Sequence, residues 1–386
     1  MKKIVYISTI AYSDVDISFL SVAQKKLDIT YIITVGIDGK QGCALDLRES
    51  RLVPGLNPAT EIPYMSRYKG IIDLHKVYVF YKTSRHAYQF KSLLQERFLY
   101  RFIKKGGFSV VHITSFPSLL NPFYFLLRRH LILTVHDPLP HFDNNYRMDK
   151  YNRLVAFKYI RNFILLNEAQ RSTFIDYYHL TNKNISIFSS SLSSYTYLNI
   201  YTSKRPAYVK HPYILFFGNI TPYKGVEYLL QAMDIVHETY PTVNLIIAGG
   251  GKFYFDISDY LAKSYLTIQN RFIPDDELSY LIKNCLFTVV PYVEATQSGV
   301  VMSSYAFFKP CVATNVGGLP EMVIDNKYGI VVEKSSSRAL ASAISELYGN
   351  NQKLTFYSEK IKEDYFGGEK SWDRISDNLK MIYNQI

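Results

Sequence analysis

A chain of 386 residues is longer than one hydrophobic core usually supports, so we expect two domains. A composition of 48% hydrophobic and 20% charged residues excludes wholesale disorder. The formal net charge of +11 suits an anionic partner, which could be a nucleotide, an anionic membrane surface or a nucleic acid.

The three cysteines are widely separated and lack the spacing of a zinc site, which indicates reduced thiols in a cytoplasmic protein. The N-terminal apolar run, residues 4–7, is shorter than the apolar region of a signal peptide. No other apolar run approaches the length that spans a bilayer. The sequence therefore predicts a cytoplasmic protein that at most rests on the inner face of the plasma membrane.

Short apolar runs alternate with helix-period segments along the first half of the chain. The runs predicted as buried strands are residues 4–7, 31–35, 77–81, 110–114, 131–135, 163–166 and 185–188. Helical patterns lie between them, for example at 18–27, 86–104 and 168–178. Strands that are apolar on both faces and alternate with helices indicate a parallel sheet.

The second half repeats this scheme. Its predicted strands are 214–217, 245–248, 267–269, 287–290, 311–313 and 330–332, and its helices include 226–240, 276–284, 300–308 and 338–348. The fold class is therefore α/β, with two Rossmann-like parallel-sheet domains.

A Ser- and Tyr-rich stretch without clear periodicity, residues 189–211, separates the two blocks and predicts a linker with a cleft beside it. We expect an N-terminal domain at 1–198 and a C-terminal domain at 199–363. Residues 364–386 include an amphipathic helix in which Trp372, Ile375, Leu379 and Ile382 share one face. We expect this helix to return toward the N-terminal domain.

Glycine-containing turns follow predicted strands of the second half at 218–225, 249–251, 291–299 and 317–321. The carboxyl ends of parallel strands meet at one edge of a sheet, where glycines and helix N-termini suit a phosphorylated ligand. The turn at 249–251 lacks the GxGxxG spacing of a dinucleotide fingerprint. The first strand-turn of the chain, residues 7–13, also lacks glycine, which argues against a nicotinamide enzyme.

Several side chains of these turns could contact such a ligand. Lys224 either meets a phosphate or is a solvated lysine at a plain turn. Glu294 either binds sugar hydroxyls or caps local amides, and Glu321 either caps its own helix or touches a sugar. Further donors follow Glu294, namely Thr296, Gln297, Ser298 and Gly299.

In the first half, His136, Asp137 and His141 follow the predicted strand 131–135. An imidazole there could orient or deprotonate a hydroxyl, or it could be a hydrogen-bonded histidine in a proline-stiffened loop. His112 lies inside an apolar run, which is typical of a core histidine.

Residues 86–105 combine basic and aromatic side chains at helical spacing. Such a helix can lie on an anionic membrane, although a domain helix with a solvated basic face is the more common explanation. There is no aromatic RNA-binding signature, zinc module or helix-turn-helix, so no nucleic acid partner is expected.

The second half resembles the retaining glycosyltransferases of family 4, which have the GT-B fold. The segments that carry this resemblance occur in the order found in that family. They are residues 216–230, 245–251, 270–277, 291–299 and 309–321, followed by the helix of Trp372.

The resemblance implies a nucleotide-diphosphate sugar, either a UDP- or a GDP-sugar, with no metal and no other cofactor. The implied catalytic residues are Lys224, which would offset charge on the departing diphosphate, Glu294, which would bind the donor sugar, and His136. The implied donor-binding residues are Gly218, Asn219, Lys224, Gly250, Arg271, Phe272, Ile273, Glu294, Thr296, Gln297, Ser298, Gly299, Ser304 and Glu321.

The implied reaction moves a hexose-type sugar, with retention, to a hydroxyl of a glycan or lipid-linked acceptor in surface polysaccharide or glycolipid assembly. Two differences from the family favour an alternative, a catalytically silent GT-B protein that binds a partner. Asn219 stands where the family commonly has arginine, and Met302 or Ser304 stands where it often has a second glutamate. A nucleotide-sugar epimerase on the same fold is a further alternative.

Overall fold

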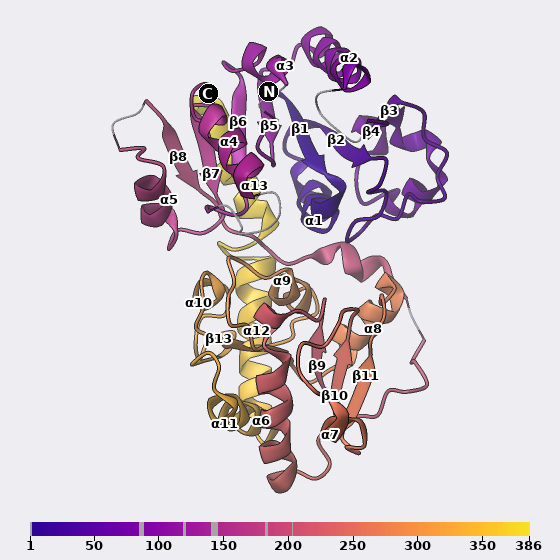
Figure 1. The fold of residues 1–386 in the computed structure, drawn as a ribbon, viewed down its shortest axis with the longest axis vertical. Helices are drawn as coiled ribbons and strands as arrows, with labels where there is room; N and C mark the ends of the chain where they lie inside the picture. Colours follow the sequence, from indigo (N-terminus) through magenta and orange to yellow (C-terminus); the bar gives the residue numbers. More distant parts are fainter. Residues whose placement is uncertain (1, 85–88, 119–120, 140–145, 182–183, 203) are drawn as a thin grey trace. The chain divides into compact units, whose positions relative to one another are not determined.

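The computed structural model describes residues 2–84, 89–118, 121–139, 146–181, 184–202 and 204–386. The chain divides into two compact units (Figure 1). Unit 1 comprises Met1–Leu192 and Trp372–Ile386, and unit 2 comprises Ser193–Ser371. The sequence predicts domain boundaries after residues 198 and 363. The first lies a few residues after the division at Leu192, and the second lies a few residues before the division at Ser371.

Unit 1 contains an eight-stranded sheet in the order β3-β4-β2-β1-β5-β6-β7-β8. Neighbouring strands are parallel except β3, which is antiparallel to β4. The strands are β1 (Lys3–Thr9), β2 (Asp28–Gly36), β3 (Gly55–Pro58), β4 (Val77–Lys82), β5 (Val110–Ile113), β6 (Leu131–Val135), β7 (Asn162–Leu165) and β8 (Ser186–Ser189). Only β3 was not predicted, because its sequence, Gly-Leu-Asn-Pro, lacks an apolar run.

The helices of unit 1 are α1 (Ser13–Ala23), α2 (Phe90–Gly106), α3 (Pro122–Leu126), α4 (Tyr146–Ala156), α5 (Arg171–Tyr177) and α13 (Trp372–Gln385), with short 3-10 turns η1 (Ile10–Tyr12), η2 (Ala59–Glu61), η3 (Pro63–Tyr68) and η4 (Leu74–Lys76). The helix predicted at 18–27 begins and ends earlier than expected. Its first turn carries Asp14 and Asp16, which favour the positive end of a helix dipole.

The C-terminal helix α13 packs on α1 within unit 1. The rings of Trp372 and Phe19 lie 5.8 Å apart. The Lys26 side chain, three residues after the end of α1, forms ion pairs of 2.8 Å with Asp373 and 2.9 Å with Asp377. Both an apolar face and flanking charges therefore attach this helix to unit 1.

A buried carboxylate organises the polar part of the unit 1 core. Asp16 accepts hydrogen bonds of 2.8 Å from the hydroxyls of Tyr6 and Tyr31, and all three side chains are buried. Burial raises the pKa of Asp16 to about 7.

Beside the Asp16 group, the His112 ring forms a hydrogen bond of 2.6 Å with the Tyr383 hydroxyl, and burial lowers the pKa of His112 to about 3. His112 is thus a core histidine, as expected.

Unit 2 contains a six-stranded parallel sheet in the order β11-β10-β9-β12-β13-β14. The strands are β9 (Ile214–Phe217), β10 (Leu245–Ala248), β11 (Leu266–Gln269), β12 (Thr288–Val290), β13 (Cys311–Thr314) and β14 (Gly329–Val332). The helices are α6 (Val226–Thr239), α7 (Ser258–Leu261), α8 (Asp275–Asn284), α9 (Gly299–Tyr305), α10 (Leu319–Met322), α11 (Ser337–Tyr348) and α12 (Asn351–Phe366), with 3-10 turns η5 (Thr196–Ile200) and η6 (Pro222–Lys224).

The residues expected to form a featureless linker are partly ordered within unit 2. Ser193 and Ser194 are buried, and Ser279 in α8 donates a hydrogen bond of 3.2 Å to the Leu198 carbonyl in η5. Across the described ranges, no helix is both long and apolar enough to cross a bilayer.

The Asp16 cluster yields a first prediction. Asp16→Ala removes the acceptor of two buried phenols, and each unsatisfied buried donor costs about 1–3 kcal/mol, so the free energy of unfolding should fall by about 2–4 kcal/mol. Chemical denaturation followed by the fluorescence of Trp372, the single tryptophan, reports on this unit directly. The matched control is Asp176→Ala, at an exposed site in α5, which should change stability by at most about 0.5 kcal/mol. Equal effects of the two substitutions would contradict the role of Asp16.

Candidate functional site

Four loops of unit 2 share the carboxyl edge of its sheet. They follow β9, β10, β12 and β13, which are adjacent in the sheet. The parallel strand order therefore brings the predicted turns at 218–225, 249–251, 291–299 and 317–321 to one edge.

The loop after β9 touches the loop after β12 through a glycine. Gly225 has φ of +63° and links η6 to α6. A Cβ at this position would lie only 2.0 Å from the carbonyl oxygen of Pro291. Beside it, the Val293 amide donates a hydrogen bond of 2.8 Å to the Tyr223 carbonyl. Only glycine allows this approach of the two backbones.

The loop after β12 touches the loop after β13 in the same way. Gly317 has φ of +52°, and a Cβ there would lie 1.5 Å from the carbonyl oxygen of Ala295. The Thr314 hydroxyl donates a 2.5 Å hydrogen bond to the Tyr292 carbonyl. Consecutive loops along this edge thus contact each other through their backbones.

Lys224, in the loop after β9, lies over the side chain of Tyr292, in the loop after β12. Its ammonium donates a 2.5 Å hydrogen bond to the hydroxyl of buried Tyr292 and stands 3.9 Å from the centre of that ring. It makes no ion pair with a carboxylate of the described residues. Burial lowers the pKa of Lys224, and the Tyr223 phenol opposes this shift. A half-buried cation that lacks a carboxylate partner is suited to an incoming anion.

Tyr292 is a site residue that the sequence reasoning did not select. Its hydroxyl contacts Lys224 and lies 3.4 Å from the hydroxyl of Ser298, which caps α9 at the Val301 amide. The signal for it was present, because Tyr292 lies two residues after the end of β12, inside the predicted turn at 291–299. Tyr292 therefore joins Lys224 to the predicted Ser298.

The remaining residues of the Glu294 loop lie at the surface of unit 2. Glu294 and Gly299 are exposed, and Thr296 and Gln297 are half-buried. They are thus accessible to a ligand, as is exposed Asn219 in the β9 loop.

Ser304 is placed differently from the expectation. It is fully buried in α9, where its hydroxyl bonds the Val300 carbonyl at 2.8 Å and the Thr288 hydroxyl at 2.9 Å. The first contact lies within α9, and the second attaches α9 to β12 in the core. The structure therefore removes Ser304 from the accessible candidates, because helix α9 turns this position toward the sheet and away from the loop surface.

The segment Arg271, Phe272 and Ile273 adjoins the β10 loop. A Cβ on Gly250 would lie 3.6 Å from the Arg271 backbone, which is ordinary contact. Phe272 is 62% exposed and Ile273 is buried. The Arg271 guanidinium pairs with Glu277 at 2.5 Å, which fixes its position beside the exposed Phe272 ring. The loop that contains Gly218 lies beside Gly250, because the Ile220 amide of that loop donates a hydrogen bond of 2.9 Å to the Gly250 carbonyl.

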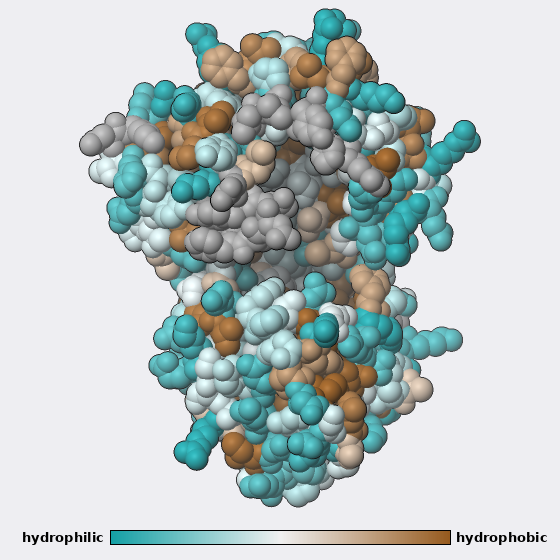
Figure 2. All heavy atoms as spheres, in the orientation of Figure 1, coloured by the Kyte–Doolittle hydropathy of each residue, from teal (hydrophilic) through white to brown (hydrophobic). Residues whose placement is uncertain are grey.

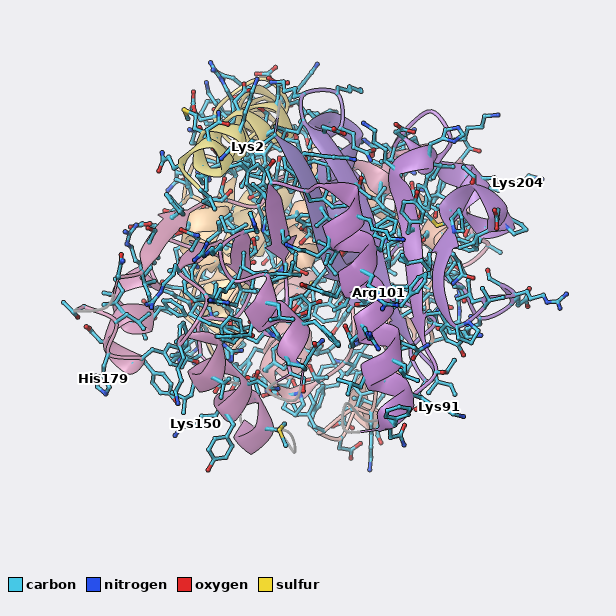
Figure 3. The ribbon with its side chains drawn as sticks, turned by 90° about the horizontal axis from the view of Figure 1, so that it is seen from above. Lys2, Lys91, Arg101, Lys150, His179 and Lys204 are labelled. Atoms are coloured by element: carbon cyan, nitrogen blue, oxygen red, sulfur yellow. The ribbon has the colours of Figure 1, made fainter. Side chains whose placement is uncertain are left out.

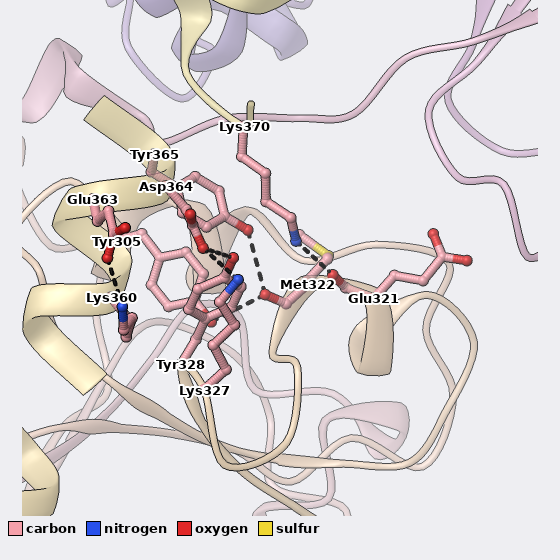
Figure 4. Close-up of polar contacts among 10 residues, drawn as sticks. All are labelled: Tyr305, Glu321, Met322, Lys327, Tyr328, Lys360, Glu363, Asp364, Tyr365 and Lys370. Carbon is pink, nitrogen blue, oxygen red and sulfur yellow. Dashed lines mark hydrogen bonds and ion pairs between the residues drawn. The ribbon is translucent and has the colours of Figure 1, made fainter. Parts of the chain in front are cut away.

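A cluster of tyrosines and lysines holds helix α10, which carries Glu321 (Figure 4). The hydroxyls of Tyr305 and Tyr365 donate to the Met322 carbonyl at 3.1 and 3.3 Å. The Lys370 ammonium donates to the Glu321 carbonyl at 3.0 Å, and burial lowers its pKa to about 8. These bonds satisfy carbonyls at the end of a one-turn helix and hold the backbone of Glu321, whose side chain is exposed, at the loop edge.

In unit 1, His136 follows β6 and stacks on Tyr12, with ring centres 3.8 Å apart. Its Nε2 is buried and has no hydrogen-bond partner in the described ranges. Burial lowers the pKa of His136 to about 4, so the ring is neutral near pH 7. The buried Arg153 side chain supports this loop by donating a 2.6 Å hydrogen bond to the Asp137 carbonyl. His141, which was expected beside it, lies outside the described residues.

A polar cavity of about 270 Å³ lies at the carboxyl ends of β1, β2, β4 and β5 in unit 1. Its wall includes the ion pair of Lys82 and buried Glu96, with a distance of 2.5 Å. The hydroxyl of Ser84 is buried there and has no partner in the described part of the chain. Ser92 and Asn121 also line it. Sequence reasoning missed this cavity because its polar residues come from separate segments without a motif.

The described residues contain no group of three or more His, Cys, Asp or Glu that could hold a metal ion.

The three cysteines are free thiols, of which Cys285 and Cys311 are buried. Burial raises the pKa of each of these two to about 12, so neither is a reactive thiolate near neutral pH.

The family model described as glycosyl transferases group 1 matches residues 211–350. A region of 175 residues is 31% identical to an uncharacterized glycosyltransferase of Methanocaldococcus jannaschii, and it covers 45% of this chain and 48% of that protein. The chain spans about half the length of the curated relatives it matches. The resemblance stated from the sequence is thus confirmed for the second half.

Solved structures extend the similarity in fold to both units. HepE of Anabaena in complex with UDP aligns over 100% of both chains, with a TM-score of 0.67 and 14% identity. Sucrose-phosphate synthase of Thermosynechococcus elongatus aligns over 100% of this chain and 99% of its own, with a TM-score of 0.67 and 15% identity. The expected GT-B fold, with two Rossmann-like parallel-sheet units, is confirmed.

The loop contacts yield a second prediction. Gly317→Ala forces a left-handed residue to carry a Cβ, at a cost of about 1–2 kcal/mol, and also pushes the Ala295 carbonyl away. We expect chemical denaturation to show a loss of at least this size for unit 2. The control is Gly367→Ala, because a Cβ there would meet its nearest atom at 3.6 Å. A Gly317 variant as stable as this control would contradict the proposed backbone contact.

Proposed function

Because residues 211–350 match the family model of glycosyl transferases group 1, we propose that this protein is a retaining glycosyltransferase that uses no metal. It moves a hexose-type sugar from a nucleotide-diphosphate sugar to a hydroxyl of a glycan or lipid-linked acceptor. The observation that carries the proposal is Lys224, which has no carboxylate partner among the described residues and is held on Tyr292 where two loops meet.

Lys224 has the position and the charge to hold the diphosphate. Breaking the bond between the sugar and the diphosphate increases negative charge on the leaving group, and a fixed cation stabilises that charge most in the transition state. The Tyr292 hydroxyl and ring fix the ammonium before the donor arrives. No reorganisation is then required during the reaction.

The sugar and the base would bind on either side of Lys224. In the proposal, Glu294 and the polar groups of its loop bind the sugar hydroxyls, and Phe272 and Ile273 contact the base beside Gly250. Uracil is the first candidate for the base, because solved structures of HepE, which has the same fold, contain UDP and UDP-glucose. A GDP-sugar is the second candidate.

Unit 1 would bind the acceptor. The cavity near Glu96 and Lys82 offers a carboxylate, an ammonium and several hydroxyls, which match the alternating donors and acceptors of a sugar ring. In this proposal the neutral His136 orients the reacting groups. The product would enter surface polysaccharide or glycolipid, and the protein would work in the cytoplasm at the inner face of the plasma membrane.

A catalytically silent protein of the same fold is the second candidate. The observation that favours it is Asn219, which is exposed in the β9 loop and adds no positive charge beside Lys224. Such a protein would not release nucleotide from a donor sugar. An epimerase would instead convert the sugar without transferring it.

The third prediction tests the donor site. We expect UDP-glucose or GDP-mannose to raise the melting temperature of the wild-type protein, and Lys224→Met to abolish that shift. Where an acceptor supports transfer, the same variant should lower kcat/KM by about 10²–10³-fold, which is typical for the loss of one charge-stabilising group. The control is Lys252→Met, an exposed lysine after β10, which should behave as wild type. Absence of a shift with every donor would favour the silent protein.

The fourth prediction tests the acceptor cavity. Saturation-transfer NMR with methyl glycosides of glucose, galactose, mannose and N-acetylglucosamine should detect binding of at least one of them. Glu96→Gln should weaken it at least about tenfold, because a charged hydrogen-bond acceptor is replaced and Lys82 loses its partner. The control Glu61→Gln changes an exposed residue of η2 and should keep the signal. A signal that survives in the Glu96 variant would exclude this cavity as the acceptor site.

A further inference from the structure

The outward side of α2 and α3 in unit 1 carries large apolar side chains in solvent. On α2, Phe90 is 72% and Phe98 is 56% exposed, and Leu94 lies between them one helical turn from each. On α3, Phe125 and Leu126 are about half exposed. The helices adjoin, since the rings of Tyr100 and Phe123 stack 5.5 Å apart. We call these exposed residues and the cations between them the α2–α3 surface.

The fold of α2 explains why these residues face outward. Its inward side consists of Ser92, Glu96, Leu99 and Ile103, which are buried and spaced by three or four residues. Burying that side leaves Phe90, Leu94 and Phe98 in solvent. The space-filling view shows hydrophobic and hydrophilic residues side by side at the end of unit 1 formed by α2 and α3 (Figure 2).

The charges of the α2–α3 surface are of one sign. Exposed Lys91, Arg97, Arg101, Lys104 and Lys105 line the outer side of α2, and none of them forms an ion pair with another residue in the described ranges. Figure 3 views this end of unit 1 and shows Lys91 and Arg101 along α2.

Among the described residues, no ion pair with a carboxylate compensates these cations. Exposed Arg128 and Arg129 extend the positive charge beyond α3, and the sequence from Arg97 to His136 contains no Asp or Glu. The one carboxylate of α2, Glu96, is buried and paired with Lys82. The surface therefore retains its full positive charge.

We propose that the α2–α3 surface binds an anionic phospholipid bilayer. Cations alone would suit any polyanion, but apolar rings interleaved with them suit a membrane interface, where rings enter the headgroup region and cations meet lipid phosphates. Nucleic acid would instead require a groove or stacking platform, and the exposed apolar residues would remain in water. The occupant is therefore a lipid surface and not a soluble polyanion.

The surface also borders the polar cavity of unit 1. Ser92 and Glu96 of α2 and Asn121 and Tyr124 at α3 line that cavity. Docking of α2 and α3 on a bilayer would place the cavity at headgroup level. This step rests on the proposed function, because it assigns the cavity to the glycan part of a lipid-linked acceptor. Membrane binding itself does not depend on transfer.

The fifth prediction is measured by co-sedimentation of the full chain with vesicles. Wild-type protein should bind vesicles of phosphatidylcholine and phosphatidylglycerol, should not bind phosphatidylcholine alone, and should be released by added salt. The combined variant Arg101→Gln, Lys104→Gln, Lys105→Gln should lower the partition coefficient by about tenfold or more. The matched control neutralises three exposed lysines of unit 2, Lys252→Gln, Lys283→Gln and Lys334→Gln, and should bind as wild type.

A second variant separates a membrane from a polyanion site. Leu94→Gln, Phe98→Gln keeps every charge and a helix-forming residue at each position. We expect it to lower binding to anionic vesicles severalfold and to leave binding of a short duplex DNA unchanged. The proposal is overturned if wild-type protein does not bind anionic vesicles, if the two triple charge-neutralising variants have the same effect, or if the apolar variant binds vesicles as wild type does. Failure of donor binding at Lys224 would leave this measurement unaffected.

Discussion

The close approach of neighbouring backbones at the carboxyl edge of the unit 2 sheet determines the rest of the site. Gly225 lies against Pro291, and Gly317 lies against Ala295, at distances that no side chain with a Cβ would permit. Because these loops touch, Tyr292 is buried beneath Lys224. The Tyr292 phenol positions the lysine and leaves its charge intact, whereas a carboxylate at the same place would neutralise it. A single geometric requirement thus produces a fixed, uncompensated positive charge. That charge is the basis of the proposed nucleotide-sugar chemistry.

The two units differ in how they are built for binding. The unit 2 edge consists of glycine turns whose backbones contact each other, and α10 is additionally held by the hydroxyls of Tyr305 and Tyr365. The unit 1 cavity consists of side chains from separate strands and helices, with Glu96 and Lys82 at its wall. A rigid backbone cradle suits the constant part of a ligand, such as a diphosphate. A cavity of side chains is more easily altered, which suits an acceptor that differs between enzymes of one fold.

The sequence predicted the two parallel sheets and the turns of unit 2 because both depend on local patterns. Buried parallel strands are continuous apolar runs, and the turns that follow them contain glycine. Strand β3 escaped prediction because it is short and contains glycine and proline. Ser304 is buried although it was selected as a binding residue, because alignment to a family position does not take into account which side of α9 faces the core. The contact between Tyr292 and Lys224 and the cavity at Glu96 depend on packing between distant segments, which no local pattern reveals.

Hydrogen–deuterium exchange of the full chain with saturating UDP-glucose, and separately with GDP-mannose, tests the central claim most directly. The measurement reports backbone protection for each loop without requiring an acceptor. The account predicts that one of the two donors slows exchange in the loops at 218–225, 249–251 and 291–299. Protection should be centred on the segments around Lys224 and Glu294. Unchanged exchange in all three loops with both donors, or protection confined to unit 1, would contradict it.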